Sequence, residues 1–262
     1  MQGKYYSTKI RPYIKPSDQH TAFGARDVLF DWVAVEIPAG TPKLVSAFAN
    51  LRPKGDAGAT INNFGFLLFF ADDDRTSLGT VNSSQDDRPH RDLVGALEFS
   101  AENTIAMGVN SSVCTMVSGP TLDADHGRFD NLVLRPKDSL DAHTAGYRTI
   151  YIGALAVGAL DWTSINAIAE AGDAEDATTQ VITMDDGSAG GTMDVREHFA
   201  IGDTVAIGTS VGTPAADSQL GVIQSVDSAT QLTLTDVSAT ELVDGDVLYN
   251  IHPMEITLNF EY

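Results

Sequence analysis

The sequence has few side chains whose type and spacing suggest chemistry. Its six histidines are scattered, and none has a second histidine or a cysteine at the spacing of a transition-metal site. They are His20, His90, His126, His143, His198 and His252. Cys114 is the single cysteine, which excludes an internal disulfide and a cysteine-built metal cluster, and its thiol is expected to be a small buried group. We therefore predict no transition-metal centre.

One acidic segment has the carboxylate spacing of a calcium-binding loop. Asp123 and Asp125 alternate along the chain and are followed by Gly127 and Asp130. The segment lacks the third early carboxylate and the closing glutamate of an EF-hand loop. A solvated turn is the expectation, and Asp123, Asp125 and Asp130 are the calcium alternative.

Motifs for catalysis are missing from the sequence. It contains no Gly-x-Ser-x-Gly elbow, Walker loop, His-Glu-x-x-His motif or dinucleotide-binding Gly-x-Gly-x-x-Gly. A carboxylate pair for glycoside hydrolysis stays open, because two acids can come from distant strands and the chain has 36 Asp and Glu. Trp32 and Trp162 lie in strand-like segments, where packing is expected rather than sugar stacking. We predict a non-enzymatic protein without a cofactor.

The charge is strongly negative and unevenly distributed. A formal charge of −20 argues against nucleic acid and anionic membranes as partners, because both are bound through basic surfaces. Residues 1–162 have 15 Lys and Arg against 19 Asp and Glu, whereas residues 163–262 have only Arg196 against 17 acidic residues. These counts predict two lobes with different surfaces.

Apolar residues follow the short alternating pattern of strands, and helix signals are nearly absent. Candidate strands in the first lobe are residues 5–10, 28–37, 43–51, 64–71, 95–99, 112–118, 132–134 and 148–157. The pattern predicts an all-β fold, with a β-sandwich or jelly-roll as the main domain. The loop from Pro38 to Pro42 is short and contains glycine, which predicts a hairpin between the strands it joins. The polar stretch 71–91 is interpreted either as a contact arm for a neighbouring subunit or as a solvated loop.

A second β unit is expected after Trp162, where the composition becomes small and acidic. A boundary is predicted near residues 167–176, followed by a small acidic β-barrel over residues 170–250. The last nine residues then alternate between apolar and polar side chains, as in a half-buried strand. We predict that this strand returns to the first sheet, so that residues 1–165 and 252–262 form the main domain.

The segment Phe199–Tyr249 resembles the small β-barrel modules of tailed-bacteriophage structural proteins. The resemblance rests on Gly202-Asp203, on Gly221-Val222-Ile223 and on the run Asp244–Tyr249. The first lobe is similar, more diffusely, to jelly-roll or sandwich virion proteins. The resemblance implies a virion structural protein present in repeated copies, with no catalytic residues.

Three functions follow as hypotheses. The first is a capsid decoration or cement protein that binds the head lattice, the second a tail, collar or receptor-contacting baseplate protein, and the third a glycan-binding or glycan-cleaving protein. The expected partners are the major capsid protein or other virion proteins and further copies of the chain, with a trimer favoured. The N-terminus lacks the apolar segment of a secretory signal, so folding in the bacterial host cytoplasm is expected before the protein joins the virion.

The first 20 residues are locally basic and form the predicted interface. They contain four basic side chains and one acidic side chain, Asp18. The basic residues are Lys4, Lys9, Arg11 and Lys15. We interpret this segment either as an arm that reaches an acidic patch on a neighbour or as a frayed, solvated terminus.

Overall fold

A computed structural model of the chain describes residues 4–19, 21–54, 61–62, 65–74, 76–86, 92–101, 104–107, 111–118, 127–129, 132–135, 145–162, 180–184, 194–208, 218–238, 241–242 and 246–262. The described fold is all-β, as the alternation predicts, with three sheets and two short helices. The helices are α1 (Pro16–Gln19) and α2 (Val195–His198).

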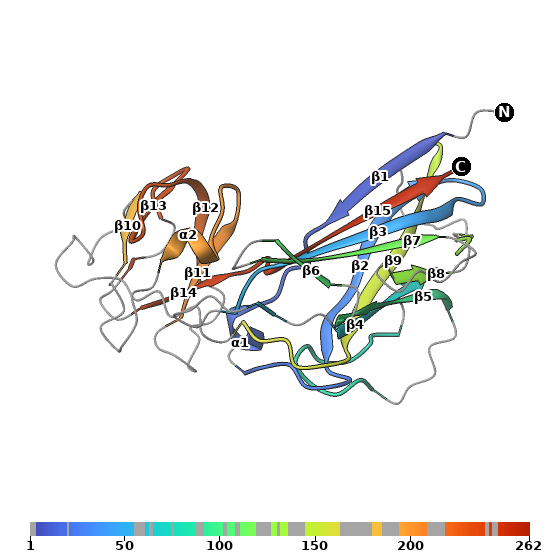
Figure 1. Ribbon diagram of the computed structural model, residues 1–262, viewed down its shortest axis with the longest axis horizontal. Helices are drawn as coiled ribbons and strands as arrows, with labels where there is room; N and C mark the ends of the chain where they lie inside the picture. The colour runs from blue at the N-terminus through green and yellow to red at the C-terminus, as the bar shows by residue number, and fades with distance from the viewer. Residues whose placement is uncertain are drawn as a thin grey trace.

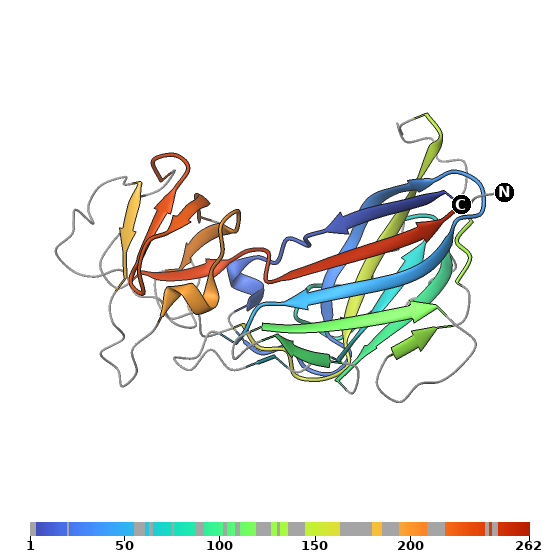
Figure 2. The same cartoon turned by 45° about the horizontal axis from the view of Figure 1, so that its top comes forward.

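Two of the sheets pack face to face and form a β-sandwich (Figures 1 and 2). The first has the order β1 (Tyr5–Ile10), β15 (Met254–Glu261), β3 (Lys43–Leu51), β7 (Ser111–Ser118) and β6 (Thr104–Met107), with β8 (Gly127–Phe129) also paired to β7. The second has the order β2 (Val28–Pro38), β9 (Tyr147–Ala156), β4 (Gly65–Ala71) and β5 (Leu93–Ser100). A single apolar core joins their inner faces, so we call this unit the sandwich.

The closing strand β15 has the structure that its alternation predicts. Met254, Ile256, Leu258 and Phe260 are at most 1% exposed, while the residues between them are half-buried. The strand lies between β1 and β3 and pairs antiparallel with both. The last strand of the chain is therefore central to the first sheet, and its predicted return to that sheet is confirmed.

The prediction of a hairpin across Pro38–Pro42 is wrong. β2 pairs with β9, and β3 pairs with β15 and β7, so the two strands belong to different sheets. Each strand buries one apolar face, and these faces point toward each other across the core. The loop therefore crosses between sheets, which lie roughly 10 Å apart in sandwiches, and Gly40 has a positive φ of 101° at this corner. Local spacing identifies both strands but not their partners.

Two further expectations for the sandwich differ from the structure. Residues 132–134 form no strand, because Val133 makes only an isolated bridge to Lys43. Within the stretch 71–91, the described residues 76–86 are not a plain solvated loop, and their contact with a neighbouring subunit stays a prediction. They run beside β2, where the N–H of Val28 donates to Ser83 and the N–H of Asn82 donates to Val28, each at 2.9 Å. Leu78 is buried at 1% exposure, so this segment is part of the packed structure.

The third sheet has its own core, and we call this unit the small sheet. Its order is β10 (Val181–Thr183), β13 (Gln231–Leu234), β12 (Ser218–Val226), β11 (Thr204–Gly208) and β14 (Val247–Asn250). Its buried apolar residues form a cluster separate from the sandwich core. No pairing between β10 and β14 occurs among the described residues, so barrel closure stays a prediction. The expected boundary at residues 167–176 lies outside the described residues.

Candidate functional site at the junction of the sandwich and the small sheet

Three residues connect β14 of the small sheet directly to β15 of the sandwich, and each is held by hydrogen bonds. Ile251 donates its N–H to Thr204 and accepts from the N–H of Ile14 at 2.9 Å. The N–H of His252 donates to Asn250 Oδ1 at 2.9 Å, and its Nδ1 lies 3.1 Å from the carbonyl oxygen of Pro12. Pro253 accepts from the N–H of Arg52 at 2.8 Å. The connection is therefore a bonded segment, not a loose linker.

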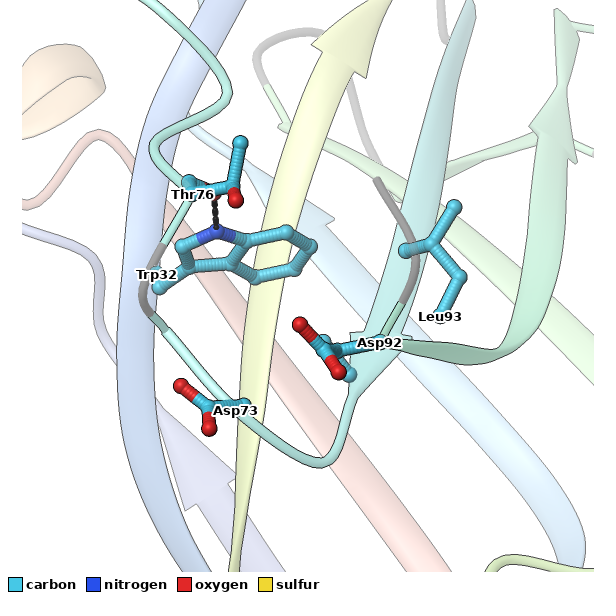
Figure 3. A pocket seen from close by; sticks show the side chains of 6 residues that line it. Trp32, Asp73, Thr76, Asp92 and Leu93 are labelled. Atoms are coloured by element: carbon cyan, nitrogen blue, oxygen red, sulfur yellow. Dashed lines mark hydrogen bonds between the residues drawn. The ribbon is translucent and has the colours of Figure 1, made fainter. Parts of the chain in front are cut away.

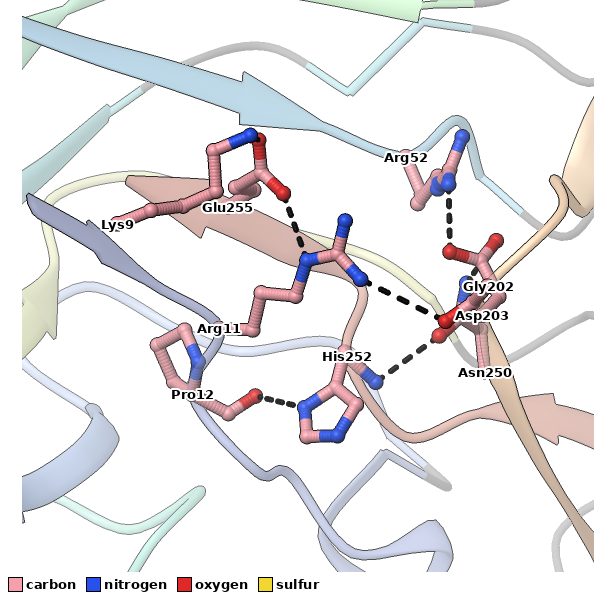
Figure 4. A network of polar contacts seen from close by, with 9 residues as sticks. All are labelled: Lys9, Arg11, Pro12, Arg52, Gly202, Asp203, Asn250, His252 and Glu255. Atoms are coloured by element: carbon pink, nitrogen blue, oxygen red, sulfur yellow. Dashed lines mark hydrogen bonds and ion pairs between the residues drawn. The ribbon is translucent and has the colours of Figure 1, made fainter. Parts of the chain in front are cut away.

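A partly buried ion pair joins the two units beside this connection (Figure 4). Arg52, just after β3, places Nη2 2.6 Å from Oδ1 of Asp203, and the side chains are 26% and 5% exposed. The second carboxylate oxygen of Asp203 accepts from Asn250 Nδ2 at 2.9 Å and from the N–H of Ala200 at 2.8 Å. Every oxygen of this buried carboxylate thus has a donor, as a desolvated charge requires.

Arg52 is itself fixed by the sandwich. Its carbonyl oxygen accepts from the indole N–H of Trp162 at 3.2 Å and from Asn62 Nδ2 at 3.0 Å. Trp162 is fully buried, as its apolar context predicts. The guanidinium therefore extends toward Asp203 from a backbone that has little freedom.

Helix α1 adds a third contact between the two units. Gln19 is fully buried and donates its Nε2 protons to the carbonyl oxygens of Ile14 at 2.7 Å and Asn250 at 3.0 Å. One amide thus connects the N-terminal segment to the end of β14. Burial of this amide nitrogen without these acceptors would be costly.

Two of the four predicted interface cations converge on one carboxylate. Lys9 Nζ lies 2.8 Å from Oε1 of Glu255, and Arg11 Nε lies 2.6 Å from Oε2. Arg11 also places Nη1 3.5 Å from the carbonyl oxygen of Gly202 in the small sheet. Burial alone would raise the pKa of the Glu255 carboxyl, but the hydrogen bonds from Lys9 and Arg11, with their charges, outweigh it and lower the pKa below 4.5.

The other two cations lie apart from this carboxylate. Lys4 precedes β1 and exchanges backbone hydrogen bonds with Tyr262 at 3.2 and 3.0 Å. Lys15 is exposed and precedes α1. Residues 5–10 form the edge strand β1, so this part of the segment is neither a free arm nor a frayed terminus. Contact with a partner through the four cations stays a prediction.

A polar cleft opens at the junction network. Its cavity volume is about 220 Å³. Its lining residues are Arg11, Asn50, Arg52, Ala200, Ile201, Asp203, His252, Pro253, Met254 and Glu255. Oδ1 of Asn50 is buried there without a hydrogen-bond partner. The arrangement balances charges and fixes an orientation, and it presents no nucleophile beside a base.

A second, smaller depression lies on the outer face of the sheet formed by β2, β9, β4 and β5 (Figure 3). The indole N–H of Trp32 donates to the carbonyl oxygen of Thr76 at 2.7 Å, and the carboxylates of Asp73 and Asp92 line the same space. Its cavity volume of about 10 Å³ is far below the range of ordinary ligand pockets. Trp32 is half-buried against Leu78 and Gly153, so packing accounts for much of its surface.

The calcium candidates Asp123, Asp125 and Asp130 lie outside the described residues. Among the described ones, no three His, Cys, Asp or Glu side chains gather where they could hold a metal ion. Within the same part of the chain, no helix has the length and apolarity needed to cross a membrane.

Sequence reasoning missed Arg52, Asp203, Asn250 and Gln19. Arg52 and Asp203 are 151 residues apart, and no local pattern relates them. The only available signal was the Gly202-Asp203 turn, where Gly202 has a φ of 86°. Comparison with protein-family models, curated proteins and solved structures finds no match to the chain.

Proposed function

We propose that this chain is a non-enzymatic structural protein of a tailed-phage virion, and that it decorates the capsid by binding the head lattice in many copies. The observation that carries the proposal is the junction. It holds two β units of very different charge in one orientation, with a buried ion pair and hydrogen bonds at the connection. A protein that must present one end to a lattice and the other to solvent needs such a fixed body.

The charge of each unit supports the sandwich as the docking end. Residues 163–250 have Arg196 against 15 Asp and Glu, whereas residues 1–162 have 15 Lys and Arg against 19 acidic residues. Close-packed copies of the small sheet would repel one another, and copies of the sandwich would do so far less. The small sheet lies at one end of the molecule, away from the start of β1 and the end of β15 (Figures 1 and 2). The opposite end of the sandwich can therefore face the lattice.

Binding to heads that lack the protein tests this orientation. Lys4→Glu with Lys15→Glu changes exposed predicted cations without removing β1, and we expect weaker, more salt-sensitive binding. Lys4→Gln with Lys15→Gln, the matched neutral variant, should lie between wild type and the charge reversal. A chain in which a short linker replaces residues 171–250 should bind like wild type, and loss of binding in that chain alone would reverse the proposed orientation.

A tail, collar or baseplate location is the alternative within the same class. It uses the same rigid body, with a trimer of this chain at a symmetric position. Labelling the protein on intact particles separates the two, because decoration proteins cover the head and tail components cluster at one vertex.

The depression at Trp32 favours a second candidate function, glycan binding. It combines an indole with the carboxylates of Asp73 and Asp92, which are the groups that stack on and hydrogen-bond to sugars. A glycan array with the wild type and with Trp32→Phe tests it. Binding that the substitution abolishes would support this function, and a blank array together with no release of reducing sugar would remove it.

A further inference from the structure

Strand β1 is an edge strand whose outer side has no partner among the described residues. Lys4 and Tyr262 exchange two backbone hydrogen bonds. Because hydrogen-bonded pairs alternate along antiparallel strands, Tyr6, Thr8 and Ile10 also direct their N–H and C=O groups toward β15. The N–H and C=O groups of the residues between them then point away from the sheet. These residues are Tyr5, Ser7 and Lys9, and all three are exposed.

Two other edges of the described sheets are covered in part. The start of β2 bonds to the segment 76–86, which forms bridges at Asp27 and Val28. The end of β14 is bonded by Gln19. A long bare edge is a surface that folded proteins normally block. The same fold that covers β2 with its own loop leaves β1 open.

The side chains along this edge are those of a contact surface. Tyr5 is 74% exposed, the highest value among the large apolar and aromatic side chains that the structure describes. Tyr6 of β1 and Tyr147 of β9 pack with ring centroids 5.2 Å apart, and both are half-buried. Tyrosine is enriched at protein interfaces because it buries a large rigid area at low entropic cost.

We propose that β1 pairs antiparallel with β1 of a second copy of this chain, across a two-fold axis at Ser7. In this register Ser7 faces the partner's Ser7, and Tyr5 faces the partner's Lys9. The outward N–H and C=O groups of Tyr5, Ser7 and Lys9 on both chains then form hydrogen bonds with each other. The first sheets of the two copies become one continuous sheet.

The edge is self-complementary in charge as well as in backbone geometry. Tyr5 lies beside Glu261 of β15, so the partner's Lys9 meets an aromatic ring with a carboxylate next to it. Lys4 and Lys9 are balanced here by Glu255 and Glu261, in a chain whose total charge is −20. Two copies can therefore approach at this edge with much less repulsion than at the small sheet.

A single edge strand that pairs with itself gives a two-fold contact, because both chains use the same surface. The trimer that the resemblance favours needs a different contact. The proposed pairing is independent of the virion assignment, since it requires only the chain. It joins three residues per chain, so the dimer is expected to be weak and concentration-dependent.

Sedimentation equilibrium over a concentration series tests the pairing with the purified chain. The weight-average mass of the wild type should rise toward twice the monomer mass. Ser7→Pro removes an outward N–H and places a ring at the two-fold axis, while the bonds to β15 do not involve that N–H. It should stay monomeric at every concentration, with the melting temperature of dilute wild type. Ser7→Ala keeps the N–H and should dimerise as wild type does.

A second pair of variants keeps the test valid if proline disturbs the strand. Tyr5→Asp places an acid beside Glu261 at an exposed position and should abolish the dimer, whereas Tyr5→Phe should retain it. A wild type that is monomeric throughout the series overturns the proposal. So does a trimer, and so does a dimer that survives both Ser7→Pro and Tyr5→Asp.

Discussion

The sandwich and the small sheet are both antiparallel β structures, but they are stabilised differently. The described sandwich core has 27 buried apolar residues with seven aromatic rings among them, whereas the small sheet core has 12 with Phe199 as its one aromatic. The small sheet also has most of the excess negative charge. A small core with a self-repelling surface is expected to be the less stable unit and to depend on its contacts at the junction.

Loss of β15 should have the largest effect and should remove the sandwich altogether. Its four inward residues each contribute roughly 1.5–3 kcal/mol of burial, and the strand separates β1 from β3. A chain without residues 254–262 is expected to yield no soluble folded protein on expression. A truncated chain that retains the wild-type melting temperature would contradict the central position of β15.

Arg52→Ala should affect the small sheet more than the sandwich. The substitution leaves the Asp203 carboxylate, which is 5% exposed, without its cation. Such a loss lowers the free energy of unfolding by about 3–5 kcal/mol for a fully buried pair, and by less for a partly exposed pair such as this one. Hydrogen exchange should show faster opening of β11 and β14 than of β3.

The double variant Arg52→Ala with Asp203→Asn is the control for this pair. It removes the uncompensated charge, so its stability should exceed that expected from adding the two single effects. Strict additivity, or faster exchange in the sandwich core, would mean that the pair does not hold the small sheet.

Gly153→Ala should act on the sandwich alone. A Cβ at this position would lie 2.5 Å from Leu78 Cδ1 and 3.1 Å from Trp32 Cε3, so the covering segment must shift. The expected loss is about 1–3 kcal/mol, measured by chemical unfolding. Gly158→Ala is the matched control, because nothing lies within 4 Å of its added Cβ, and it should leave stability within about 0.5 kcal/mol of wild type.

Glu255→Gln should have the smallest effect, and the effect should depend on pH. The folded-state pKa of Glu255 is below the ordinary 4.5, so the ionised carboxylate stabilises the fold above that pH, and the contribution is lost as pH falls through the folded pKa. Lys9 and Arg11 are about half exposed, so the pair contributes under about 1 kcal/mol. Melting temperatures of wild type and variant should differ at pH 7 and converge as the pH falls through the folded-state pKa of Glu255. A difference that persists at low pH would assign the effect to packing.

The strands of the sandwich could be predicted because their signal is local. The alternation in residues 5–10 and 43–51 gives β1 and β3 with their observed bounds, and the last residues give β15. Strand partners could not be predicted in the same way. The Pro38–Pro42 loop has the length of a hairpin, yet the apolar faces on either side of it belong to opposite sheets.

The junction was beyond sequence reasoning for a related physical reason. Arg52, Gln19 and Asn250 are ordinary polar residues until the fold brings them together at the junction. Lys9 and Arg11 were identified by charge alone, and the structure shows that they already bind Glu255. Composition identified the basic segment and the acidic unit, while the contacts that orient them come from the tertiary structure.

Cryo-electron microscopy of virions from cells that produce this protein, with a tag inserted in the small sheet, tests the proposed function most directly. We expect density for the sandwich against the head lattice, many copies per particle, and the tag on the solvent side. Virions without the protein, or a tag buried against the shell, would contradict the account.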